Sequence, residues 1–506
     1  MRLGKGVRTV CTAIVGCAYA LGSPAEGQSL PEAVALAYET NPSLKLQRQQ
    51  VRITDEAFVQ ARSGLRPQIN ASLTTSYSAT TVNAGRSGLV DTNGDGVPDT
   101  TVGGSGVTER NFGNTSITLI QSLYTGGRTS AAISAAEADI LAAREALRDT
   151  EASVLQMVVQ AYTDVRRDMR VVDVRERDIA TLTRQLDEAE ATFDAGLLTG
   201  TDVAQAKARL GTSRSQLAAA RSQLEISRGV FAQVVGREPD NLLPEPSLEA
   251  LLPPSLGDAI THAEAENGRL RSATLNALAS RKRVDVAKTQ RHPTISLRGS
   301  AGYSGQVDPF APDRLAQNVT ASLTTTFPLY AGGLYASQIR QAVERTAQDE
   351  ARVEVTRRQI RQLARQAWNQ LQAARAAVSA NVEVMTAANI AAVGVRLEYE
   401  VGLRNTLDIL NAELELRNAE LALINARRDE YVASSAVLSV IGHFEAQTLS
   451  PGLPRNESAE SFERVRHDGL WAPWDATMRG LDNLGHARPS IPTERLSTPA
   501  HPSPQG

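Results

Sequence analysis

The chain has 506 residues, and its 53 basic and 56 acidic side chains give a formal net charge of only −3. Because basic and acidic residues alternate along the sequence and form no basic stripe, a nucleic-acid binder is excluded. Both cysteines, Cys11 and Cys17, lie in the first twenty residues, and the six histidines have no ligand-like spacing. We therefore expect no disulfide, metal or cofactor in the mature chain. The sequence also has no nucleophile–base pair or phosphate loop, so we expect no enzyme.

The N-terminus has the three-part pattern of a secretory signal peptide. Residues 1–8 carry three basic side chains, residues 9–21 are mostly small and apolar, and small residues with a proline follow up to Gly27. We expect a signal peptide over residues 1–27, while a sequence that resembles a lipidation box leaves lipid attachment to Cys17 as an open alternative. No later window has eighteen consecutive apolar residues, so we expect no transmembrane helix. Any part that spans a membrane would then consist of β-strands.

The chain repeats itself. At an offset of 206 residues, Leu-Tyr-x-Gly-Gly occurs at 123–127 and again at 329–333. Upstream the offset is 226, as for Asn41 and Asn267, so the first half carries twenty extra residues. A register held over more than a hundred residues indicates an internal duplication. The expected units are residues 28–236 and 256–442, joined by a Pro-rich linker over 237–255.

Each unit contains a long helical pattern. Residues 128–195 have neither Gly nor Pro, and as one helix they would extend roughly 100 Å. Apolar residues recur at spacings of three and four positions among many alanines, which predicts a coiled coil. Turns at Gly196 and Gly402 follow, and a second helix then returns, so each unit should form a helical hairpin with its tip at the turn. Thr201-Asp202 and Asn405 are the expected N-caps. The predicted helices are 30–64, 128–195 and 201–236, then 256–291, 334–401 and 406–442.

The segments before the long helices alternate apolar and polar residues with period two. This pattern, rich in Ser and Thr, is typical of outer-membrane strands, and it predicts strand hairpins over 67–124 and 293–330. Four strands cannot close a barrel. They require either a partner sheet, as at the edge of a soluble protein, or several copies of the chain.

Two further segments stand apart from this plan. The twenty-residue insert contains Asp91, Asn93, Asp95 and Asp99, which resemble half of a calcium loop, although position twelve is Val102 where such loops have glutamate. A solvated turn is the favoured interpretation, and calcium binding stays open. The tail over 446–506 loses periodicity and fills with Pro, Ser, His and Gly, which predicts disorder.

The chain resembles the TolC family of outer-membrane efflux and secretion channels over residues 28–445. The resemblance rests on the signal peptide, on the turn sequences, and on the duplicated order of helix, strand hairpin, long helix and returning helix. The resemblance implies a mainly α fold with a small β part, assembled as a homotrimer. Each chain would give four strands to a 12-stranded β-barrel in outer-membrane lipid and its hairpins to a periplasmic α-helical barrel. The trimer would be the exit duct of a tripartite efflux pump or type I secretion system, and it would dock an inner-membrane transporter through a periplasmic adaptor protein. The cargo does not follow from the sequence.

The resemblance also assigns roles at the hairpin tips. Tyr399 and Arg404 occupy the places of the family's linking tyrosine and arginine, and Thr201 and Asp202 occupy those of their partners. Such bonds between neighbouring helix pairs would hold the periplasmic end closed. They are strong enough to pin a helix and still reversible.

A pore constriction is implied beside these links. Asp408 matches the first constricting aspartate, whereas Asn411 replaces the second and removes three charges from a trimer's throat. Helix capping is the alternative role for Asp202 and Asp408.

A different class of protein would also use long exported hairpins. A periplasmic adaptor or scaffold without a pore is the alternative, but it would not need two amphipathic strand pairs in each chain.

Overall fold

The structure is a computed structural model that describes residues 28–82, 88–90, 96–97, 100–102, 106–307, 312–450, 462 and 475–482. The expected signal peptide with Cys17, and the candidate calcium ligands Asp91, Asn93, Asp95 and Asp99, lie outside these residues. The chain divides into two compact units, which are described separately. The strand unit comprises described residues within 46–150, 263–362 and 454–506, and the tip unit comprises 28–45, 151–262 and 363–450.

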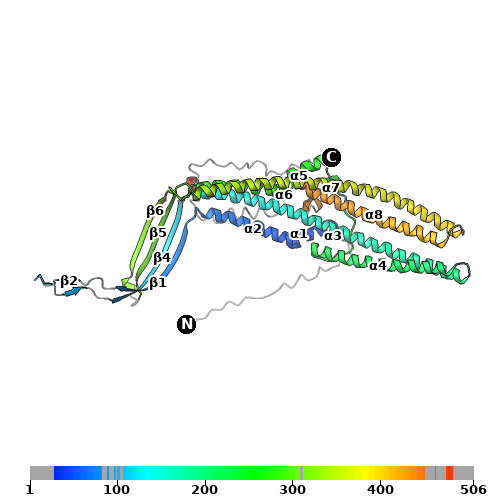
Figure 1. Ribbon diagram of the computed structural model, residues 1–506, viewed down its shortest axis with the longest axis horizontal. Coiled ribbons are helices and arrows are strands. Elements are labelled where there is room, and N and C mark those ends of the chain that lie inside the picture. The colour runs from blue at the N-terminus through cyan, green and yellow to red at the C-terminus, as the bar shows by residue number, and fades with distance from the viewer. Residues whose placement is uncertain are drawn as a thin grey trace, which may run out of the picture. The chain divides into compact units, whose positions relative to one another are not determined.

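The strand unit is built on one antiparallel four-stranded sheet with the order β1–β4–β5–β6 (Figure 1). β1 pairs with β4 and β5 pairs with β6, which are the two predicted hairpins, and pairing of β4 with β5 joins them. Part of the insert forms a separate two-stranded sheet, β2–β3. The bounds are β1 Gln68–Val82, β2 Gly88–Val90, β3 Thr100–Val102, β4 Gly106–Tyr124, β5 Thr294–Gln306 and β6 Ala316–Thr326.

The four-stranded sheet has one apolar and one polar face. The register places Ala71 opposite Ile117 and Ala301 opposite Val319 on the apolar face, where Ile117 and Val319 are 58% and 69% exposed in the single chain. Serine, threonine and asparagine predominate on the other face, where cross-strand pairs such as Ser72 with Ser116 share a hydrogen bond of 3.0 Å. The predicted alternation is therefore present in the strands.

One strand is shorter than the apolar pattern indicates. The pattern continues to Leu329, but β6 ends at Thr326. Proline at 328 has no N–H for the ladder and restricts Phe327 before it, so pairing stops there.

Helices complete both units. α3 (Arg128–Asp194) and α7 (Leu334–Glu400) have 67 residues each and contribute to both units. In the strand unit, a small core brings Phe58 of α2 against Ala136 and Ile140 of α3. The remaining α-helices, apart from the tail, are α1 Leu30–Thr40, α2 Pro42–Ser63, α4 Gly200–Val235, α5 Leu256–Glu266, α6 Gly268–Thr289 and α8 Thr406–Ile441.

The duplication is visible in the helix bounds. α3 and α7 begin and end 206 residues apart, as do α4 and α8. α1 and α5, and likewise α2 and α6, are 226 residues apart at both ends. Gly236 and Gly442 close α4 and α8 in the same left-handed conformation, with φ of 87° and 80°.

The single helices expected over 30–64 and 256–291 are each broken in two. Asn41 lies between α1 and α2 with an extended ψ of 123°, because Pro42 follows and disfavours the helical region for its predecessor. Its amide donates to the carbonyl of Val234 at 2.9 Å. Asn267 adopts nearly the same conformation, with ψ of 122°, and its side chain accepts from the Leu270 N–H.

Tyr162 of α3 fixes the inter-repeat linker in the tip unit. Its hydroxyl lies 2.9 Å from the carbonyl oxygen of Gln28 and 2.6 Å from that of Leu243, so the two oxygens share its one proton. Its ring lies 6.4 Å from that of Phe231. Burial raises the pKa of Tyr162 to about 12, so the phenol remains a neutral donor at physiological pH. The linker is therefore a docked part of the tip unit.

Two histidines that are far apart in sequence meet in the tip unit. The rings of His262 and His443 lie 5.1 Å apart, edge to face. Sequence spacing did not indicate this pair, because the tertiary fold creates it.

The tail contains helical segments where disorder was expected. α9 (Ala446–Leu449) and α11 (Asp475–Asp482) are helices, so that expectation does not hold for these residues. Their order depends on specific contacts, described below for α11, and composition alone does not register such contacts.

One helix in the described part of the chain, α7, is long and apolar enough by length and composition to cross a membrane. The sequence criterion of eighteen consecutive apolar residues missed it, because this window includes polar residues and at most two charged ones. Only 6% of the window is buried within the chain.

Removing the Tyr162 hydroxyl should loosen the linker. We expect Tyr162→Phe to lower the free energy of unfolding by about 1–2 kcal/mol, since two buried carbonyl oxygens lose the proton that they share. Urea titration followed by circular dichroism measures this. Tyr330→Phe, at a side chain that is 90% exposed, is the matched control, and equal effects of the two changes would contradict the assignment.

Candidate functional site

Each hairpin tip is built from two back-to-back capping motifs. α3 ends in a Schellman motif, in which Gly196 N–H donates to Phe193 O at 2.8 Å and Leu197 N–H donates to Thr192 O at 3.1 Å. α7 ends in the same way, and Gly402 occupies the position of Gly196. The two glycines have φ of 78° and 79°, so the predicted tip turns require the left-handed conformation that glycine adopts without strain.

A capping box opens each returning helix. Thr199 is the N-cap of α4, where its N–H and hydroxyl both donate to the Asp202 carboxylate, at 3.1 and 2.7 Å. The expectation that Thr201-Asp202 forms the N-cap is therefore wrong, because the helix already begins at Gly200. Asp202 is instead the N3 residue of the capping box.

The second tip follows the prediction. Asn405 is the N-cap of α8, and its side chain accepts from the Asp408 N–H at 2.9 Å. Asp408 in turn accepts from the Asn405 N–H at 3.3 Å. The capping alternative for Asp202 and Asp408 thus describes what both carboxylates do within one chain.

The predicted link residues are not joined to one another in the single chain. In the described residues, no hydrogen bond connects Thr201 or Asp202 with Tyr399 or Arg404. Tyr399 is half-buried in the last turn of α7, and Thr201 is exposed in the first turn of α4.

Arg404 has its own acidic environment. Its Nε donates to Glu398 at 2.7 Å. This bond, together with the charges of Glu398 and Asp408, raises the pKa of Arg404. The guanidinium therefore stays charged and lies close to the predicted constriction residue.

Asn411 contacts the other hairpin of the chain. Its Oδ1 accepts a hydrogen bond of 2.9 Å from Nη2 of Arg209 on α4. A neutral side chain thus faces an arginine at the place where the family pattern has a second aspartate.

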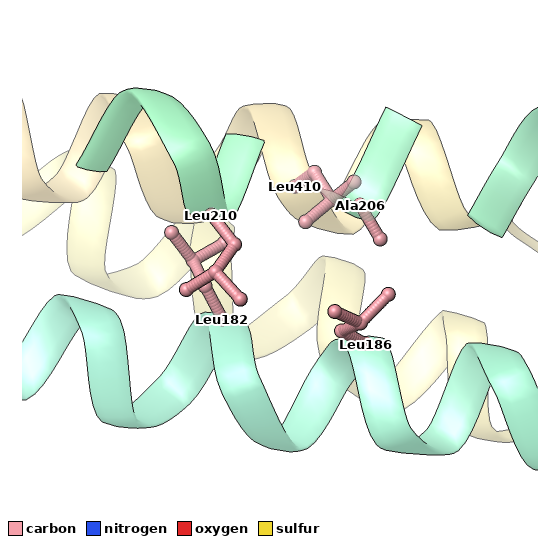
Figure 2. Close-up of a cluster of buried hydrophobic side chains, with 5 residues drawn as sticks. All are labelled: Leu182, Leu186, Ala206, Leu210 and Leu410. Carbon is pink, nitrogen blue, oxygen red and sulfur yellow. The ribbon is translucent and has the colours of Figure 1, made fainter. Parts of the chain in front are cut away.

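Beneath the tips, an apolar cluster connects the two hairpins of one chain (Figure 2). Leu410 of α8 is buried against residues of α3 and α4, so the second repeat packs directly on the first. The remaining buried members are Leu182, Leu186, Ala206 and Leu210.

A buried ionic cluster beside this core was not predicted from the sequence. Glu413 of α8 is only 3% exposed. It is paired with Arg396 and accepts from Gln185 of α3 at 2.6 Å. Arg417 lies 3.5 Å from Glu413 and also pairs with Asp178, which is buried on α3.

The repeat comparison contains a signal for this cluster. At the 206-residue offset, Glu413 corresponds to Lys207 and Arg417 corresponds to Gly211. Charges present in one repeat and absent or reversed in the other indicate a role that the shared fold does not require.

The profile of the outer membrane efflux protein family matches residues 33–237 and 259–443, which are the two repeats. The chain belongs to this family. It is similar to the outer membrane efflux protein BepC of Brucella suis, with 34% identity over 447 residues that cover 88% of this chain and 92% of that protein. It is also similar to the outer membrane protein TolC of Escherichia coli, with 24% identity covering 84% and 85% of the two chains.

A solved structure supports the fold. The outer membrane protein VceC of Vibrio cholerae superposes with a TM-score of 0.63 at 20% identity, covering 82% of this chain and 96% of that one. The mainly α fold with a small antiparallel sheet is confirmed, as are the location in the outer membrane and the channel interpretation. The alternative of a pore-free adaptor has no support among these relatives.

The buried cluster should hold the two hairpins together. We expect Glu413→Ala to lower the free energy of unfolding by about 3 kcal/mol, because it removes a buried carboxylate that pairs with Arg396 and Arg417. Thermal unfolding followed by circular dichroism is the measurement. Glu415→Ala, an exposed glutamate on the same helix, should stay within about 0.5 kcal/mol of wild type; a similar loss in both variants would refute the role of Glu413.

Proposed function

We propose that three copies of the chain form one outer-membrane duct through which an inner-membrane transporter expels its cargo. The observation that carries this proposal is the open four-stranded sheet. In the described part of the chain, β1 and β6 each pair on one side only. Pairing β6 of one copy with β1 of the next closes twelve strands into a barrel and leaves no free edge.

The two faces of the sheet fit this arrangement. The apolar face would contact outer-membrane lipid, and the face with Ser, Thr and Asn would line the lumen. Closure also pairs the backbone groups of both edges, which lipid cannot solvate.

The exposed apolar residues of α7 and its following turn support assembly of the helical part. Ile390, Leu397 and Val401 are 68%, 58% and 70% exposed in the single chain. Apolar surface of this extent marks an interface. The apolar window of α7 would face neighbouring helices in the assembled helical barrel.

The duct would work with two partners. We propose a periplasmic adaptor protein that joins the helical end to the inner-membrane transporter. The name of BepC, an outer membrane efflux protein, favours a role in efflux. Type I secretion remains the second candidate cargo route, since the same tube serves either.

The periplasmic end would be the gate. Tyr399 and Arg404 would bond Thr201 and Asp202 between neighbouring helix pairs. Each such bond is worth about 1–3 kcal/mol, and three symmetric copies act on one opening. Asp408 and Asn411 would then line the constriction.

Breaking the links should open the gate. We expect Tyr399→Phe combined with Arg404→Ser to raise single-channel conductance in planar bilayers and to make cells sensitive to large antibiotics. Arg214→Ser removes the same charge from an exposed position of α4 and should conduct like wild type. Heat-resistant trimer bands and outer-membrane fractionation establish assembly first. A double variant that assembles normally but conducts like wild type would place the gate elsewhere.

Restoring the second aspartate should tighten the constriction toward cations. Asn411→Asp adds three carboxylates to a trimer, and we expect block by a trivalent cation to become about tenfold tighter, which corresponds to ~1.4 kcal/mol. Arg209 will neutralise part of this gain, so Asn411→Asp with Arg209→Gln should be blocked more tightly still. Asn411→Ser is the neutral control. Equal block of Asn411→Asp and Asn411→Ser would exclude Asn411 from the constriction.

A further inference from the structure

The last residue of α11 is a fully buried carboxylate. Asp482 is 0% exposed and accepts hydrogen bonds from the loop that joins β4 to α3. Its Oδ1 accepts from the Thr125 N–H at 2.7 Å, from the Thr125 hydroxyl at 2.8 Å and from the Gly127 N–H at 3.3 Å. Its Oδ2 accepts from the N–H and hydroxyl of Ser130, at 3.4 and 3.2 Å.

These donors surround the first turn of a 67-residue helix. α3 begins at Arg128, and the first amides of a helix have no partner within it. The helix dipole adds partial positive charge at the same place, so a carboxylate is the matching group. Thr125 caps the Thr129 N–H at 3.1 Å, while Asp482 takes the amides of Gly127 and Ser130. The tail thus completes a cap that the junction makes only in part.

A second contact holds the tail to the same unit. Phe462 packs against the core of α2 and α3, with its ring edge-on to Phe58 at 5.3 Å between centroids. The guanidinium carbon of Arg144 lies 5.2 Å from the centre of the Phe462 ring. Two residues twenty positions apart in the tail are therefore anchored to the strand unit.

The second repeat does not offer the same site. At the 206-residue offset, Thr125 and Ser130 correspond to Ala331 and Ala336, which have no hydroxyl groups. Leu329 and Tyr330 at that junction are 93% and 90% exposed. A tail carboxylate can thus be held by five donors at the first repeat only.

We propose that the loop Thr125–Ser130 is a carboxylate-binding site whose occupant is the chain's own C-terminal segment. Asp482 supplies the N-terminal cap of α3 from a distance of more than 350 residues in sequence. Phe462 holds the segment against α2 and α3. This clasp, which we define as the contacts of Asp482 with Thr125–Ser130 and of Phe462 with α2 and α3, stabilises the strand-to-helix junction of the first repeat. The corresponding junction of the second repeat has no such contact among the described residues. This inference does not rest on the proposed channel function.

Hydrogen–deuterium exchange on the full-length, assembled protein tests the clasp. In Asp482→Ala, the amides of a peptide covering 123–131 should exchange about tenfold faster than in wild type, because Thr125, Gly127 and Ser130 lose their acceptor. Protease cleavage within the tail should accelerate by a similar factor. Thr477→Ala, at an exposed position of the same helix, is the matched control and should change neither rate.

Further variants separate the clasp from general loss of structure. Ser130→Ala keeps the carboxylate and removes one hydroxyl donor, and it should speed tail cleavage about threefold. Ala336→Ser, the corresponding change at the second junction, should have no effect. If Asp482→Ala fails to assemble, Ser130→Ala decides by the same two rates. Unchanged exchange at 123–131 in an assembled Asp482→Ala protein, or equal acceleration in Thr477→Ala, overturns the proposal.

Discussion

Backbone pairing at the edges of the four-stranded sheet is the constraint on which the rest of the structure depends. β1 and β6 present N–H and C=O groups that the described chain does not pair on their outer sides. In lipid, each unpaired group costs several kcal/mol. In the proposed trimer, folding of the strands and association of the copies would therefore be coupled, and the stability of the sheet would depend on the concentration of the chain. The helices would also require association, because their exposed apolar residues would be buried only against neighbouring copies.

The duplication gives the two repeats the same backbone structure, and differences in their side chains give them different contacts. Helix bounds coincide at fixed offsets, and both tips have the same glycine and the same capping box. Side chains then break the symmetry in two places. Near the tips, only the second repeat has the buried Glu413; at the strand-to-helix junction, only the first has hydroxyls that can hold Asp482. Each repeat thus carries one stabilising contact that the other lacks.

Much of the architecture could be predicted because it depends on local chemistry. Long stretches without Gly or Pro, period-two alternation and turn glycines are properties of neighbouring residues, and they located α3, α7 and the two hairpins within a few positions. The break at Asn41 was missed although Pro42 marks it, because helical periodicity continues on both sides. The N-cap of α4 was displaced by two residues, since Thr199, Thr201 and Asp202 are all good capping residues and only geometry chooses among them.

The candidate site was less accessible to sequence reasoning. Glu413 pairs with residues on two other helices, and Asp482 reaches a loop more than 350 residues away, so no local pattern reveals either. Composition predicted a disordered tail, because one aspartate and one phenylalanine do not change the average composition of a Pro- and Ser-rich sequence. An average over composition does not detect contacts that single residues make across long sequence separations.

The paired motifs at each tip also determine how a hairpin can transmit force. A Schellman motif closes one helix and a capping box opens the next, with only Leu197 and Leu198, or Leu403 and Arg404, between the turn glycine and the N-cap. Such a short turn, with a capping motif on each side, allows little change in backbone conformation. Displacement of one helix therefore carries its partner with it, and each hairpin acts as a stiff lever whose bending occurs along the coiled coil and not at its end.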